Sequence, residues 1–244
     1  MRILWILPCL FWLSFAGGLH YTGNNMSQTS ESERKELPTA YAKRFHGKLD
    51  KGSFPDQATW EKTPAIRYED DWQGKNPDVQ RATEVRLLWT PGTLFIRFDC
   101  KYRTITVFPD SREDGFRLGM WDRDVAETFL QPDSTDPMVY TEFEVSPNNK
   151  WIDLAVSHGK IKELHSGLWR RVEMDDKAQT WTAELAIPMA GLTKHFDVNK
   201  PWRANFYRIE GEEEPRFYSA WSPTYTPKPS FHVPARFGTL IFQE

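Results

Sequence analysis

Cysteine is almost absent from this chain of 244 residues, which contains only Cys9 and Cys100. Cys9 lies inside an apolar run at the N-terminus, and Cys100 ends an alternating apolar segment. If the N-terminal run is removed as a leader, Cys100 has no partner within the chain. The sequence therefore excludes a disulfide framework and a cysteine-rich metal site, and it predicts that Cys100 packs as a small hydrophobic residue.

Several short motifs that carry chemistry in other proteins are also missing. None of the 6 histidines has the paired spacing His-Glu-x-x-His, and no Cys-x-x-Cys-His haem attachment occurs. The chain has neither a glycine-rich phosphate loop nor the Gly-x-Ser-x-Gly turn of serine hydrolases. Basic and acidic residues are mixed, and the formal net charge is -3, so nucleic acid is not a predicted partner.

The chain has no long apolar run beyond its N-terminal segment. That segment has the composition of a secretory leader. Arg2 supplies a positive start, and residues 3–15 are apolar apart from Pro8 and Ser14. The run is shorter than a membrane span, which favours cleavage over an uncleaved anchor. Residues 1–18 are therefore predicted to be a signal peptide. The mature protein is expected to be secreted or periplasmic, and to meet a membrane only through this segment.

The remaining chain is predicted to form one domain behind a tether. Residues 19–44 are polar and mixed in charge, which predicts a flexible linker before a domain over residues 45–244. No stretch has the pattern of a long amphipathic helix, whereas short alternating segments such as 94–100 and 180–187 recur between Gly, Pro and Asn turns. This pattern predicts an all-β fold. We expect an antiparallel β-sandwich of immunoglobulin-like, jelly-roll-like or DOMON-like type, with short helical turns.

Aromatic residues make up 14% of the chain, which is high for a sequence this polar. Trp121 stands among charged residues, just before an alternating run over residues 125–130 in which Glu127 is predicted to point out of a strand. An aromatic ring can cover the apolar face of a sugar while a neighbouring carboxylate accepts hydrogen bonds from its hydroxyls. The alternative is that Trp121 packs in the core and Glu127 is simply solvated.

A second aromatic candidate lies in the proline-rich segment over residues 219–238. Four prolines stiffen the chain around Phe231, which lowers the entropy cost of holding that ring outward toward a ligand. The alternative is that Phe231 closes one end of the sandwich.

Carboxylates on predicted neighbouring strands raise the question of catalysis. Glu142 and Glu144 share one face of a strand by their spacing, and either could pair with Glu127. Such a pair could hydrolyse O-glycosyl bonds as a glycoside hydrolase does. The sequence supplies no pocket around them, so a non-catalytic protein is favoured and no catalytic residue is assigned.

These segments, in this order, resemble the family-9 carbohydrate-binding modules and the wider set of family-9-like secreted proteins. The resemblance covers residues 45–244. It is carried by Gly47-Lys-Leu-Asp50 with Trp60, Val85-Arg-Leu-Leu-Trp89 with Leu94-Phe-Ile96, Trp121-Asp-Arg-Asp-Val-Ala-Glu127-Thr-Phe, Ala220-Trp-Ser and Arg236-Phe-Gly-Thr-Leu240.

The resemblance implies a β-sandwich with structural calcium that clamps a terminal sugar between two aromatics. By position, Trp121 and Phe231 fall on the aromatics and Glu127 on the acidic ligand, although the clamp-forming members have Trp where this chain has Phe231. Glu144 and Lys228 fall where those members have a sugar-contacting Arg and Asn. The implied partners are a polysaccharide or oligosaccharide, and a separate glycoside hydrolase acting in carbohydrate catabolism. The calcium ligands cannot be assigned from the resemblance.

A different function is also compatible with such a sandwich. Related folds can carry haem b for electron transfer, held by Met, His or Lys side chains. Met120, Met138 and His232 are the candidate ligands, although no haem-specific motif surrounds them.

Overall fold

The computed structural model describes residues 36–244, whose strands join in a single 13-stranded sheet. In chain order the strands are β1 (Thr39–Arg44), β2 (Ala65–Tyr68), β3 (Thr83–Thr90), β4 (Thr93–Lys101), β5 (Val125–Gln131), β6 (Val139–Val145), β7 (Trp151–Ser157), β8 (Lys160–Glu163), β9 (Trp169–Asp175), β10 (Thr180–Pro188), β11 (Trp202–Glu210), β12 (Phe217–Ala220) and β13 (Gly238–Gln243). The helical pieces are α1 (Gln57–Glu61), η2 (Met120–Asp122), η3 (Met189–Gly191) and η4 (Pro234–Arg236).

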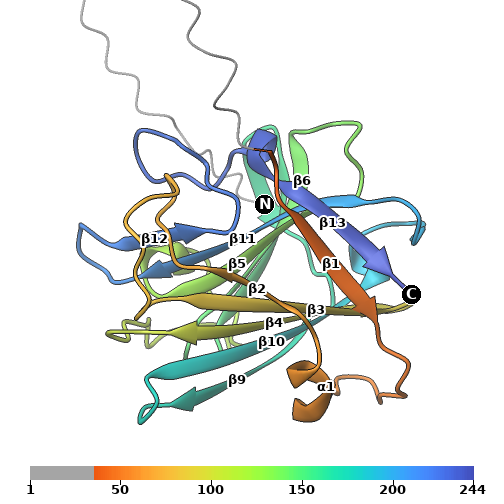
Figure 1. Ribbon diagram of the computed structural model, residues 1–244, viewed down its shortest axis with the longest axis horizontal. Helices are drawn as coiled ribbons and strands as arrows, with labels where there is room; N and C mark the ends of the chain where they lie inside the picture. Colours follow the sequence, from red (N-terminus) through yellow and green to blue (C-terminus); the bar gives the residue numbers. More distant parts are fainter. Residues whose placement is uncertain (1–35) are drawn as a thin grey trace, which may run out of the picture.

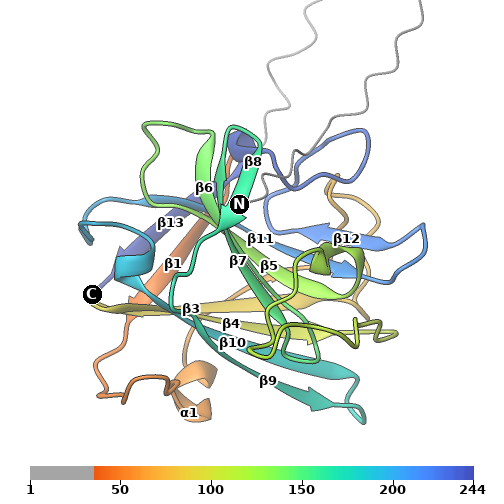
Figure 2. The same ribbon diagram turned by 180° about the vertical axis from the view of Figure 1, so that it is seen from behind.

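The sheet curls so that its two halves face one another (Figures 1 and 2). The strand order is β8-β7-β6-β5-β11-β13-β1-β3-β4-β10-β9, with β12 on β11 and β2 on β3. The rings of Phe98 on β4 and Phe206 on β11 meet across the interior, with centroids 6.3 Å apart. The predicted all-β sandwich is therefore confirmed. Its pairing is antiparallel except at β1, which runs parallel to both β13 and β3.

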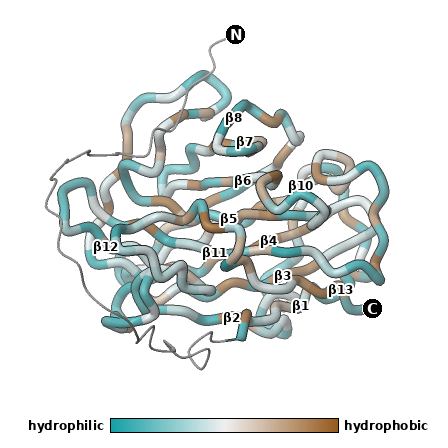
Figure 3. The backbone as a smooth tube through the Cα atoms, turned by 90° about the horizontal axis from the view of Figure 1, so that it is seen from above, coloured by the Kyte–Doolittle hydropathy of each residue, from teal (hydrophilic) through white to brown (hydrophobic). Residues whose placement is uncertain are grey.

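Alternating apolar residues produce the core between the two halves. On β4, Leu94, Ile96, Phe98 and Cys100 are all fully buried, and β10 pairs with this strand in antiparallel register. Figure 3 shows hydrophobic positions recurring along the central strands, while hydrophilic positions dominate many of the outer loops. Cys100 packs as a small hydrophobic residue, as predicted, and burial raises the pKa of its thiol to about 12.

Strand β1 corrects the predicted boundary of the linker. Residues 19–44 were predicted to be flexible, but Thr39–Arg44 lies in the sheet between β13 and β3, with Ala40 and Ala42 buried. Small and polar residues give this strand too little hydrophobicity to be recognised, and its partners lie far away in sequence. The predicted signal peptide, residues 1–18, and residues 19–35 of the predicted linker lie outside the described residues.

Strand β5 is buried along its whole length because both of its faces are covered. The inner face packs into the sandwich core. The outer face of β5, β6, β7 and β11 carries a second apolar cluster, closed by Phe116 and Met120 from the β4–β5 connection and by Phe231 and Phe237 from the β12–β13 connection. These loops form the walls of a site. Across residues 36–244, no helix has the length and apolar character to span a bilayer.

Candidate functional site

A pocket of about 300 Å³ opens on the outer face of β5 and β6. Four of the five residues predicted to bind sugar line it, namely Trp121, Glu127, Glu144 and Phe231. The fifth, Lys228, is exposed on the neighbouring loop and does not line the pocket. The complete lining consists of Trp121, Glu127, Glu142, Glu144, Leu154, Ile161, Ile209, Arg216, Tyr218, Pro229, Ser230, Phe231 and His232.

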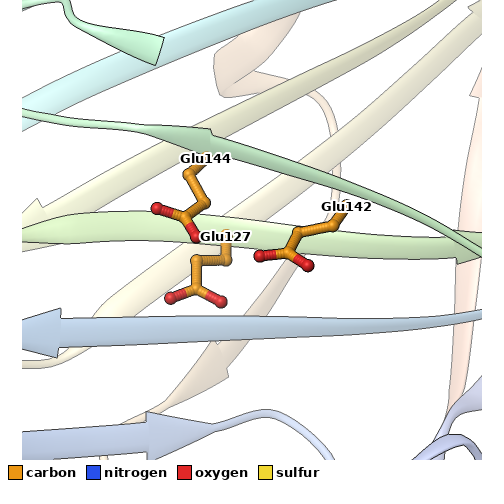
Figure 4. A group of neighbouring side chains, drawn as sticks. All are labelled: Glu127, Glu142 and Glu144. Carbon is orange, nitrogen blue, oxygen red and sulfur yellow. The ribbon is translucent and has the colours of Figure 1, made fainter. Parts of the chain in front are cut away.

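Three glutamates form a tight cluster in this pocket (Figure 4). Glu127 on β5 lies directly opposite Glu144 on β6. Glu142 precedes Glu144 by two residues and therefore lies on the same face of β6. One carboxylate oxygen from each lies within 4.8 Å of the others. Their exposed fractions are only 2%, 3% and 0% for Glu127, Glu142 and Glu144, so the cluster is almost fully withdrawn from water.

Four of the six oxygens of these carboxylates lack a hydrogen-bond partner. Oε1 of Glu127, Oε2 of Glu142 and both carboxylate oxygens of Glu144 are buried without one. Burial raises the pKa of Glu127 well above its usual range, and the charge of Glu142 adds to the effect while Arg216 opposes it. Burial is also the main cause of the raised pKa of Glu144. The charges of Glu127 and Glu142 raise this pKa further, as does the hydrogen bond that Glu144 shares with Glu142 when one of the two carboxyls is protonated. The cluster must therefore retain protons or receive a positive charge from outside the chain.

Trp121 forms one side of the pocket. It lies in the short helix η2, is partly buried, and packs against the apolar cluster of the outer face. Its carbonyl oxygen accepts a hydrogen bond from Nη1 of Arg216 at 2.8 Å. The predicted solvent-facing loop is thus a helical turn that holds the indole partly covered, intermediate between the exposed and core alternatives.

Phe231 is buried, with only 6% of its surface exposed. Its ring stacks on Tyr207, with centroids 4.1 Å apart and an interplanar angle of 11°. The Tyr207 hydroxyl donates a hydrogen bond to the Phe231 carbonyl at 3.0 Å. The expectation that the prolines hold Phe231 outward is therefore wrong, because Tyr207 on the outer face of β11 needs an apolar cover. Phe231 still borders the pocket.

Sequence reasoning missed Arg216 and Tyr218, which also line the pocket. Arg216 Nε contacts Glu214 Oε1 at 3.1 Å, and its guanidinium lies over the Tyr218 ring at 4.9 Å from the centroid. Neither residue belongs to a pattern that points to a ligand. Tyr218 lies on β12 and Arg216 directly precedes it, and the pairing of β12 with β11 brings both residues to the site.

The three residues considered for haem do not meet at one site. Met120 is buried in the outer-face cluster, whereas Met138 is exposed in the turn before β6. Only His232 lines the pocket, where its Nδ1 lies 2.8 Å from the Tyr140 hydroxyl.

A larger pocket of about 800 Å³ lies elsewhere, beside Gly52 and Trp169. Gly52 has a φ of +83°, and a Cβ at this position would come 2.8 Å from Cε3 of Trp169. Trp169 is 44% exposed, so the chain carries a second accessible indole far from the glutamate cluster in the sheet order. This pocket contains a single carboxylate, Asp50, among its lining residues.

Comparison with sequence families identifies residues 155–242 as a match to Carbohydrate-binding family 9. A curated relative, an "Extracellular protein" of Arthroderma benhamiae, is 28% identical over 178 residues, which is 66% of this chain and 78% of that protein. The match to this family model confirms the resemblance to family 9.

Solved structures share the fold at low sequence identity. A Bacteroides uniformis protein, described as a candidate carbohydrate-binding protein, superposes with a TM-score of 0.69 at 16% identity, over 85% of this chain and 100% of its own. A family 9 module from Caldicellulosiruptor kristjanssonii in complex with cellotriose has a TM-score of 0.57 at 13% identity, over 84% and 94%. The same organism's module in complex with glucose gives 0.55 at 14% identity, over 84% and 96%.

Proposed function

Because residues 155–242 carry the pattern of carbohydrate-binding family 9 within a fold shared by its modules, we propose that this protein binds the end of a saccharide chain. The observation that carries the proposal is a single pocket that gathers the Trp121 indole and the Glu127 carboxylate. In this proposal the indole stacks on the apolar face of a sugar ring and Glu127 accepts hydrogen bonds from its hydroxyls.

The size of the pocket favours a short ligand. At about 300 Å³ it stands at the lower end of ligand pockets, which run from about 300 to 1,000 Å³. An aromatic contact of this kind contributes about 1 kcal/mol beyond the area it buries. With Phe231 already stacked on Tyr207, Trp121 supplies most of the free aromatic surface, so we expect an affinity between about micromolar and millimolar.

Binding without catalysis agrees with the arrangement of the carboxylates. A glycoside hydrolase places two carboxyl groups on either side of the scissile bond. Glu127, Glu142 and Glu144 instead lie side by side on one sheet face, within 4.8 Å of one another. This arrangement favours carboxylates that bind a ligand over carboxylates that act as a catalytic acid and base.

The proposal includes a location and a partner. The "Extracellular protein" relative and the leader-like composition of residues 1–18 support export from the cytoplasm. A binding module of this class would then concentrate saccharide for a separate glycoside hydrolase. A structural calcium ion, implied by the family resemblance, stays part of the proposal, and its protein ligands are unassigned.

Isothermal titration with cellotriose and other short oligosaccharides tests this function. Trp121→Ala should weaken binding at least about tenfold, because it removes the stacking face and its buried area. Glu127→Gln should weaken it less, since an amide still accepts one hydrogen bond. Trp169→Ala is the matched control and should bind as the wild type does. Unchanged binding by Trp121→Ala, or a loss confined to Trp169→Ala, would place the sugar site outside this pocket.

A further inference from the structure

We propose that Glu127, Glu142 and Glu144 hold a divalent cation of the calcium type, whose free coordination positions face the saccharide. The cation-binding part stands on the glutamate cluster alone. The saccharide-facing part rests on the proposed function of the pocket.

The spacing of the cluster fits a shared cation. Ca²⁺ binds oxygen at about 2.3–2.6 Å, so two of its ligands can lie at most about 4.6–5.2 Å apart. One oxygen from each glutamate lies within 4.8 Å of the other two. Three carboxylates on one sheet face can therefore share one calcium ion, and the pocket that they line has space for further ligands of that ion.

The unpartnered oxygens point to a missing ligand independently of that spacing. When the three glutamates are ionised, at least one oxygen of each carboxylate is buried without a hydrogen-bond donor, and both oxygens of Glu144 are in this state. Buried carboxylates without partners are expensive, and native proteins pair them or place them on metals. Because folding has already removed water from these oxygens, a cation can bind them without a further cost of dehydrating the carboxylates.

The charge balance favours a divalent ion over an organic ammonium group. The cluster carries three negative charges when it is ionised, and Arg216 is the cation that lines the same pocket. Arg216 makes its hydrogen bonds to Glu214 and to the Trp121 carbonyl, so it compensates charge from a distance. A divalent cation leaves one negative charge on the ionised cluster, within the influence of Arg216, whereas an ammonium group leaves two.

Hard oxygen ligands also select the type of ion. Carboxylates suit Ca²⁺ and Mg²⁺, and Ca²⁺ accepts six to eight oxygens in irregular geometry. Three glutamates leave positions for sugar hydroxyls, which are oxygen ligands as well. The cluster thereby gives the pocket a second way to hold a saccharide beside the Trp121 ring.

Calcium titration into the chelator-treated full chain tests the cation site by calorimetry. The double variant Glu142→Gln/Glu144→Gln should bind Ca²⁺ at least about tenfold more weakly at this site, because two charged ligands become neutral. Glu173→Gln, an exposed carboxylate on β9, is the control and should bind as the wild type does. No Ca²⁺ binding by the wild type, or equal binding and stoichiometry in the double variant, would overturn the cation site.

A saccharide titration with and without chelator then separates this inference from the function of the pocket. Loss of sugar binding in chelator and its return with Ca²⁺ would place the ion in the saccharide site. Ca²⁺ binding at the cluster with sugar binding unaffected by chelator would overturn only the contact between ion and sugar. Ca²⁺ binding without binding of any saccharide would instead refute the proposed function and leave the ion in place. Glucosamine that binds the chelator-treated protein better than glucose does would identify an ammonium site and overturn the metal.

Discussion

The two faces of β5 and β11 bury charge in opposite ways. Toward the sandwich interior, Arg208 lies 3.8 Å from Asp124 and 3.4 Å from Glu210, and its guanidinium is 5.1 Å from the Trp181 ring centroid. On the outer face, one residue along β11, Tyr207 pairs with Glu127, which gathers with two further glutamates. The inner group contains its own counter-charge, whereas the outer group must obtain one. The inner group therefore serves the stability of the fold, whereas the outer group is suited to bind a ligand.

Backbone groups reinforce the same contrast. Oδ1 of Asp124 accepts a hydrogen bond from the Gly211 amide at 2.6 Å, and Oε1 of Glu210 accepts from the amides of Arg103 and Thr104. The inner carboxylates thus tie together the connections before β5 and after β11. The outer carboxylates make no equivalent bonds through their free oxygens.

The largest expected effect comes from breaking the paired group. Arg208→Met should lower the free energy of unfolding by about 3–5 kcal/mol, because Asp124 and Glu210 would be left buried without their cation. Urea unfolding followed by tryptophan fluorescence measures the loss. Arg208→Lys retains the charge and should lose less, which keeps the test informative if the first variant does not fold. An unfolding free energy within about 1 kcal/mol of the wild type for Arg208→Met would show that the pairing does not hold this face together.

A smaller effect of opposite sign is expected at the unpaired group. Glu144→Gln should raise the unfolding free energy of the chelator-treated protein by about 1 kcal/mol, since an amide is neutral without taking up a proton and can donate a hydrogen bond to a neighbouring carboxylate. The same urea experiment measures it, with Glu173→Gln as the control. A clear loss of stability in Glu144→Gln would mean that the free oxygens of Glu144 have partners in solution that compensate their burial.

The smallest effect concerns pH at the paired group. Burial raises the pKa values of Asp124 and Glu210 above their usual values, and Arg208 only partly opposes this. A raised pKa in the folded state gives stability that is present below the unfolded-state pKa and lost as the pH rises through the folded-state pKa. The contribution of these two groups to stability should therefore fall as the pH rises from about 4, near the usual pKa of Asp and Glu, toward neutral pH, and Asp124→Asn should make that fall shallower. Melting temperatures across this range test it, and an unchanged slope in Asp124→Asn would argue against the predicted pKa shift.

Local patterns made most strands predictable. The alternation through Leu94, Ile96, Phe98 and Cys100 reports burial on one face without any knowledge of partners, and β4 lies where this pattern predicts. Strand β1 was missed because its burial depends on β13 and β3 and not on its own small and polar side chains. Long-range pairing of this kind leaves little trace in a single sequence.

The site was predictable to the same limited degree. Trp121 and Glu127 are close in sequence, and the structure places both on one pocket. The prediction that Phe231 points outward was wrong, because the ring that it covers, Tyr207, lies on β11 and outside the proline-rich segment. The clustering of Glu127 with Glu144 depends on the register between β5 and β6, and a shift of one residue would have moved Glu144 to the other face.

The parallel pairing of β1 with β13 sets an order of events during biosynthesis. Arg44 and Glu244, which form an ion pair at the ends of these two strands, are 200 residues apart in the chain. A ribosome releases the chain from its N-terminus, so β1 emerges first and must wait for the last strand before its ladder with β13 can form. Closing so long a segment is entropically costly and slow. Until then, the waiting strand exposes unpaired backbone groups along the edge that β13 later covers.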